Sequence, residues 1–123
     1  MSSFIFSDDI DSTTMLKSFK GVVGLGVSSV DQLMDAVAKA MTFPKYFGEN
    51  WNALSDCMRD LNWIKEKRVL LVHKEIPNIK FDELAVYINI LDDAVQDWRE
   101  VGEHELFVVF PTSSEMYVLS LVE

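Results

Sequence analysis

Two histidines and one cysteine are the side chains of this sequence best suited to metal binding or nucleophilic catalysis. Neither His73 nor His104 has a cysteine or a second histidine at metal-ligand spacing, which argues against a metal site. We interpret both as ordinary residues, one at the end of a strand and one in a loop. Cys57 lies beside Leu54 and Leu61 in a helical pattern, where a thiol is usually a small core residue whose pKa burial raises. The phosphate-binding loop G-x-x-x-x-G-K-[ST] and the nucleophile elbow G-x-S-x-G are both absent from the sequence. We therefore expect no metal, no cofactor and no enzymatic activity.

Gly24 and Gly26 imitate the beginning of a dinucleotide-binding fingerprint, because they follow an expected strand and precede an expected helix. The third glycine of that fingerprint is replaced by Ser29. The acidic ribose ligand expected about 20 residues further on, after a second strand, also has no counterpart. A strand end that turns into a capped helix explains these glycines without a nucleotide.

Aspartates spaced four residues apart form a more informative pattern. Asp56 and Asp60 make a like-charged pair on one expected helix, and Asp93 and Asp97 repeat the arrangement on another. Such a pair costs an isolated helix about 0.2–0.5 kcal/mol, which a cationic partner would relieve. Surface helices also tolerate these pairs, and Arg59 can offset the first one. Rigidly held carboxylates suit a cleft that is lined with Arg, Lys and His.

Three helices should position these carboxylates. Ser29 and Gln32 form a capping-box pattern ahead of a helix at 30–41, and Asn50 can cap a second helix that runs to about Leu61. Pro44 and Gly48 interrupt the chain between them, and we expect a positive φ at Gly48. The longest helix is expected at 82–101 and should end at Gly102.

The apolar spacing predicts which face of each helix is buried. On the second helix the inward residues are Trp51, Leu54, Met58 and Leu61, and the outward ones are Asn52, Ser55, Asp56 and Arg59, with Asp60 at the edge. On the longest helix the inward residues are Phe81, Leu84, Ile88, Leu91, Val95 and Trp98, and the outward ones are Asn89, Asp93, Gln96, Asp97 and Glu100.

Short apolar segments should form the strands, at 4–6, 20–25, 69–72 and 106–110, and the pattern also allows a final strand at 117–122. The continuous run from Val69 to Val72 is typical of a strand buried on both faces, as in a parallel sheet. Strands that alternate with helices predict an α/β fold with a mainly parallel sheet of three or more strands and three to four helices. We expect one domain over residues 1–123.

The net charge of −9 is confined to the last third of the chain. Residues 1–81 hold ten acidic and ten basic side chains, whereas residues 82–123 hold ten acidic side chains and Arg99 alone. Such a field repels nucleic acid and anionic lipid and attracts a basic protein, although it also serves simple solubility. The apolar runs are too short for a membrane span, and the first residues do not resemble a signal peptide. A single cysteine agrees with a reducing compartment, so we expect a cytoplasmic protein.

The segment FPKYFGENWNALSDCMRDL, residues 43–61, carries the most specific motif. It fits a loop of the form P-x-Y-[YF]-G-x-N that leads into a helix of the form [LW]-[DN]-A-L-x-D-C. The matching residues are Pro44, Tyr46, Phe47, Gly48, Asn50, Trp51, Ala53, Leu54, Asp56 and Cys57. In this pattern the chain resembles the barstar family, and the resemblance covers roughly residues 20–110. Residues 1–18 and 112–123 would be extensions to the minimal family core.

The resemblance implies a three-stranded parallel sheet covered by helices, and a function as an inhibitor, or immunity protein, of a small basic ribonuclease toxin. In the family, the second helix and the loop before it enter the active-site cleft of the nuclease. By position, Asp56 would replace a substrate phosphate and Tyr46 would pack against the catalytic face. Asp97, with Glu100 nearby, would meet basic groups at the rim. The partner-binding set is therefore Tyr46, Asn52, Ser55, Asp56, Arg59, Asp60, Asp97 and Glu100, on a protein that is monomeric when free.

Two positions depart from the best-known member of the family. Asn52 stands where that member has an acidic residue, and Ser55 where it has a tryptophan. Asn52 brings no charge, and Ser55 removes an aromatic contact of the kind that often anchors interfaces. These departures leave open an interaction module of the same fold whose basic partner is not a nuclease.

Overall fold

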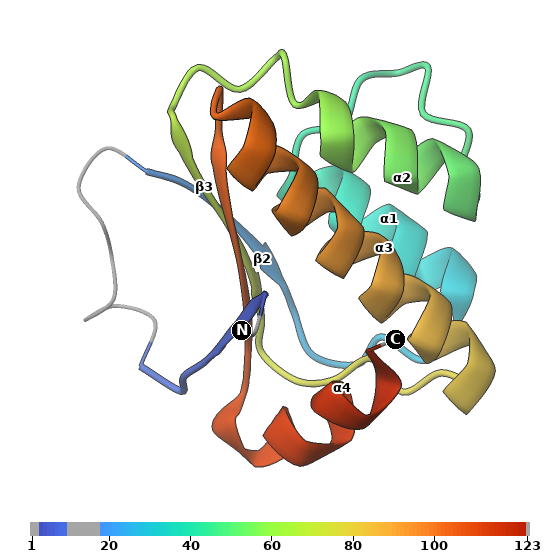
Figure 1. Ribbon diagram of the computed structural model, residues 1–123. Helices are drawn as coiled ribbons and strands as arrows, with labels where there is room; N and C mark the ends of the chain where they lie inside the picture. Colours follow the sequence, from blue (N-terminus) through green and yellow to red (C-terminus); the bar gives the residue numbers. More distant parts are fainter. Residues whose placement is uncertain (1–2, 10–17, 123) are drawn as a thin grey trace.

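The computed structural model describes residues 3–9 and 18–122, and in this part of the chain four strands form one sheet. The elements in chain order are β1 (Phe4–Phe6), β2 (Phe19–Val23), α1 (Val30–Ala40), α2 (Trp51–Asp60), β3 (Arg68–His73), α3 (Phe81–Val101), β4 (Glu105–Phe110) and α4 (Glu115–Leu121). A short 3-10 turn at Thr112–Ser114 leads into α4. Figure 1 shows α1, α2 and α3 on one side of the sheet and α4 at one end of it. Within these residues, no helix is long and apolar enough to cross a membrane.

All strand pairs in the sheet are parallel, and the order is β1-β4-β3-β2. On the central strand β3, Val69 and Leu71 belong to the main core under the helices, whereas Leu70 and Val72 join Val109 in a second cluster. Successive side chains of a strand point to opposite faces, so β3 is buried on both sides. This confirms the α/β fold with a parallel sheet, and β1 adds a fourth strand to the three that the resemblance implied.

The expected helices are present, and each begins close to its predicted residue. Ser29 caps α1 by accepting a hydrogen bond from the backbone N–H of Gln32, at 3.1 Å. Gly102 ends α3 with a φ of 81°. The close packing of α1 on β2 requires a glycine at position 21, because a Cβ there would lie 2.5 Å from the carbonyl oxygen of Ala40.

Residues 117–122 do not form a strand, contrary to one of the predictions. Residues 117–121 lie in α4, which buries Val118 and Leu121 at a spacing of three residues, and the edge of the sheet beside β4 is already taken by β1. Asn89, predicted to point outward, is half-buried and donates a hydrogen bond to the carbonyl of Leu121, at 2.9 Å. The apolar periodicity of α4 was therefore helical.

Two further local predictions were wrong. Phe81 is exposed rather than inward, because it is the first residue of α3 and projects beyond the core. In the loop before α2, the positive φ of 53° belongs to Glu49 and not to Gly48.

Candidate partner-binding surface

The loop that precedes α2 is held by aromatic contacts. The ring of Phe43 packs against Phe47 and Trp63, with centroids 4.9 and 5.9 Å apart. The indole N–H of Trp63 donates to the carbonyl of Met41, at 2.9 Å. These contacts fix both ends of the segment that carries the exposed side chain of Tyr46.

Asn50 fixes the beginning of α2. Its side-chain oxygen accepts a hydrogen bond from the backbone N–H of Ala53, at 2.8 Å, and its backbone is extended, as the N-cap position requires. The prediction of this cap is confirmed. The loop and the first turn of α2 thus keep one relative orientation, which matters for any surface that uses both.

Asn50→Ala is expected to lower the free energy of unfolding by about 1 kcal/mol, because it leaves a backbone donor of the first turn without its cap. Urea unfolding followed by circular dichroism measures the change. Asn62→Ala, at an exposed position beyond α2, is the matched control and should unfold as the wild type does. Equal stability of all three proteins would contradict the capping role.

The outward face of α2 carries the side chains that the motif singled out. Asp56 and Asn52 are exposed, whereas Ser55, which was also predicted to point outward, is half-buried. Cys57 is buried with Leu54 and Met58, and burial, followed by the charges of Asp60 and Asp56, raises the pKa of its thiol. The cysteine is thus a core residue, as predicted, and the carboxylate of Asp56 points to solvent.

Tyr46 and Asp60 connect the loop to the end of α2. The hydroxyl of Tyr46 donates to Oδ2 of Asp60, at 3.3 Å. Partial desolvation and the Asp60 carboxylate both raise the pKa of this hydroxyl, which therefore stays protonated as a donor. The tyrosine ring remains largely exposed and can serve as a contact surface.

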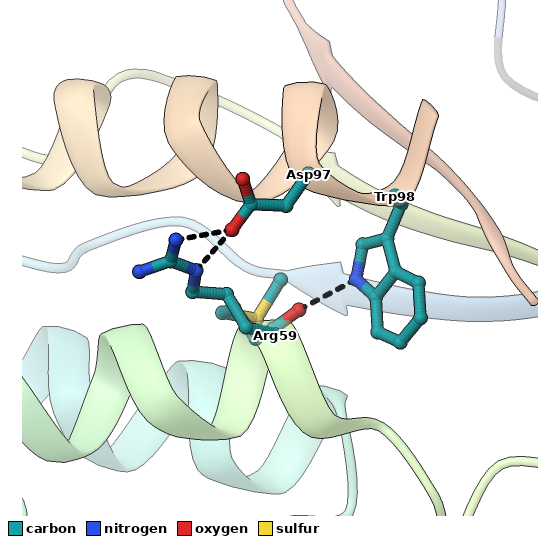
Figure 2. Close-up of polar contacts among 4 residues, drawn as sticks. Arg59, Asp97 and Trp98 are labelled. Atoms are coloured by element: carbon teal, nitrogen blue, oxygen red, sulfur yellow. Dashed lines mark hydrogen bonds and ion pairs between the residues drawn. The ribbon is translucent and has the colours of Figure 1, made fainter. Parts of the chain in front are cut away.

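An ion pair joins α2 to α3 at this surface. Figure 2 shows the guanidinium of Arg59 directed at Asp97, where Nε and one terminal nitrogen both reach the same carboxylate oxygen. Beside it, the indole N–H of Trp98 donates to the carbonyl of Met58, at 2.8 Å. A buried hydrogen bond and a surface ion pair therefore join the two helices, in addition to their apolar packing. The partner of Arg59 in this ion pair lies on α3 and not on its own helix.

His73 ends β3 and His104 lies in the loop before β4, as predicted, but both are buried and are therefore not ordinary surface residues. The ring of His104 lies edge-on to Trp98, with its two nitrogens 3.0 and 3.1 Å from the carbonyl oxygens of Glu66 and Leu61. His73 lies at the other end of the sheet, between Val109 and Tyr87. Each histidine ties separate segments together, and neither lies in a metal cluster, since the described residues contain no group of three or more His, Cys, Asp and Glu suited to a metal ion.

An open pocket of about 330 Å³ lies between the ends of α2 and α3. It brings together four residues of the predicted set, which are Arg59, Asp60, Asp97 and Glu100. Asn52, Ser55 and Asp56 do not line the pocket and lie nearer the beginning of α2. The complete lining is Arg59, Asp60, Asn62, Asp97, Trp98, Glu100, Val101, Glu103 and His104.

Glu103 and Asn62 are members of this surface that the sequence patterns did not select. Both lie in loops that follow a helix end, where no periodicity predicts the direction of a side chain. The only earlier signal was the acidic excess of the segment that contains Glu103.

The comparison with protein families agrees with this geometry. A family model described as Barstar (barnase inhibitor) matches residues 19–111. The chain belongs to the barstar family. The proteins of this family are inhibitors rather than enzymes, and their partners are ribonucleases of the barnase kind. No curated protein matches the chain. The matched region contains the loop before α2, all of α2 and all of α3, which are the elements of the candidate surface.

Proposed function

We propose that this chain is an intracellular inhibitor of a small basic ribonuclease toxin and acts in the cytoplasm as its immunity protein. Its membership of the barstar family supports a ribonuclease as the partner. The observation that carries the proposal is the exposed carboxylate of Asp56 on the family motif, held on a capped helix. Asp56 enters the active-site cleft and takes the place of a substrate phosphate.

The neighbouring groups extend this contact. Tyr46 packs against the catalytic face of the ribonuclease, with Asn52 and Ser55 beside Asp56 on the same helix. Asp60, Asp97 and Glu100 form the rim, where the net negative charge accelerates the approach of a basic protein more than it tightens the final complex. Because the helices present these groups in fixed positions, little conformational entropy is lost on binding.

Titration of barnase with the purified protein tests the proposal. RNA cleavage is expected to fall in proportion to the added protein and to stop near one equivalent. The protein alone should neither cleave RNA nor bind it at moderate salt, given its charge. Turnover of RNA by the protein itself would contradict the proposal.

Co-purification from the native host, followed by mass analysis, identifies the physiological partner. A small basic ribonuclease is the expected result. Recovery of a basic protein without nuclease activity, together with unimpaired cleavage by every ribonuclease tested, would favour an interaction module with another partner.

A further inference from the structure

Arg59 is an unusual residue for a surface that binds a basic protein. Its side chain is about half exposed, at 49%, and lies at the edge of the acidic pocket. Among the described residues that line this pocket, four carry carboxylates and Arg59 is the single Lys or Arg. A guanidinium stays charged at every relevant pH, so this positive charge cannot be removed by titration.

The ion pair also withdraws one of those carboxylates. Two nitrogens of Arg59 share one oxygen of Asp97, and the second oxygen points away from the guanidinium (Figure 2). Asp97 remains 40% exposed and can be reached by a partner. A cationic side chain that approaches Asp97 would therefore meet a carboxylate that is already neutralised, and it would be repelled by Arg59.

The fold does not depend on this pair for the contact between α2 and α3. The buried hydrogen bond from Trp98 to Met58 and the apolar core between the helices remain when Arg59 is changed. Exposed ion pairs contribute little to stability. A role in partner selection therefore explains the pair better than a role in folding.

We propose that Arg59 determines the specificity of this surface, an inference that rests on the proposed function. Its guanidinium binds the carboxylate of Asp97 and repels any cationic side chain of a partner that approaches that carboxylate. The surface therefore disfavours ribonucleases that present Arg or Lys opposite the ends of α2 and α3, and favours one that presents a hydrogen-bond acceptor there. Removing Arg59 should make the inhibitor less selective and a better binder of a general basic ribonuclease.

The test measures the kinetics of binding to barnase at low and physiological ionic strength. Arg59→Gln is expected to tighten binding about tenfold at low salt, with most of the gain in the association rate and less of it at higher salt. Arg59→Met, which keeps the aliphatic stem, should give the same gain and serves if the glutamine variant folds poorly. Arg59→Lys keeps the charge and should bind as the wild type does.

Arg99→Gln is the matched control, because it removes an equal charge from the last turn of α3 without lining the acidic pocket. Its gain should be much smaller than that of Arg59→Gln. Asp97→Asn supplies the second arm of a double-mutant cycle. It should weaken binding only slightly in the wild type and clearly more in the Arg59→Gln background, where Asp97 is released.

Several results would overturn the proposal. These are unchanged or weaker binding by both neutral variants, a gain no larger than that of Arg99→Gln, and the absence of barnase binding by the wild type and both variants. The proposed function is judged separately, by inhibition of the partner ribonuclease and its loss in Asp56→Ala. A failure of the specificity role therefore leaves that result intact.

Discussion

Asp56→Ala is expected to weaken inhibition of the partner ribonuclease more than any other change on the surface. Losses of about 2–5 kcal/mol in binding free energy are typical when one member of a desolvated, hydrogen-bonded charge pair is removed, in complexes that include barnase with its own inhibitor. The cationic groups that bind the RNA phosphate would be left buried beside an alanine. The loss should therefore come mainly from faster dissociation.

The same substitution should leave the fold intact. Asp56 is exposed on α2, and its replacement also removes the like-charged pair with Asp60. We therefore expect the free energy of unfolding to stay within about 0.5 kcal/mol of the wild-type value. Inhibition titrations, dissociation rates and thermal melts of the same preparations separate the two effects. Asp35→Ala removes another exposed aspartate, from the middle of α1, and should inhibit as the wild type does.

Two outcomes would contradict the role of Asp56 as a phosphate mimic. One is inhibition as tight as that of the wild type. The other is a loss of inhibition that is explained fully by unfolding of the variant. In either case the binding surface would have to be sought on the acidic end of α3, around Asp97 and Glu100.

The features that the sequence predicted correctly are those set by neighbouring residues. Caps at Ser29 and Asn50, the stop at Gly102 and the run from Val69 to Val72 depend on hydrogen bonds and burial within a few residues. The motif at residues 43–61 predicted the family, and with it the exposed position of Asp56. Periodicity alone also placed the acidic face of α2 correctly.

The features that it missed depend on contacts between distant segments. Arg59 has acidic neighbours on its own helix, yet its partner is Asp97, 38 residues away, because α3 packs beside α2. His104 looks like a loop residue in the sequence, but its ring is enclosed by carbonyls from the end of α2 and from the loop before β3. Only the tertiary packing determines such pairings, and the specificity inferred for Arg59 arises from one of them.

His73 provides the second large expected effect, on the dependence of stability on pH. Its Nδ1 lies 3.0 Å from the carbonyl oxygen of Val109, which can only accept, so Nδ1 carries the proton. Its Nε2 then accepts from the hydroxyl of Tyr87, at 2.6 Å, and burial raises the pKa of that hydroxyl, which stays a donor. The ring also stacks on Phe110, at 4.2 Å between centroids. The bond from Tyr87 requires a neutral imidazole, whereas Nδ1 can donate to Val109 in either protonation state.

Burial lowers the pKa of His73 from 6.5 to about 4, although the bond to Val109 acts in the opposite direction. Between these values the unfolded chain binds a proton at this residue and the folded chain does not. Stability is therefore complete above pH 6.5, falls as the pH is lowered toward 4, and loses nothing further from this group below that. At about 1.4 kcal/mol for each pH unit, the loss is about 3 kcal/mol.

Urea unfolding of the wild type and His73→Gln at pH 7.5 and pH 4.5 measures this contribution. The glutamine amide can donate to Val109 and accept from Tyr87 but does not titrate, so this variant should be the less stable protein at pH 7.5 and should lose less stability on acidification. Carboxylates titrate in both proteins, and their effect cancels in the comparison. The difference between the two proteins should therefore shrink by about 2.5 kcal/mol at pH 4.5, which lies two pH units below the unfolded-state pKa. Parallel pH profiles would mean that the folded protein accommodates a charged His73, most directly by opening the hydrogen bond from Tyr87.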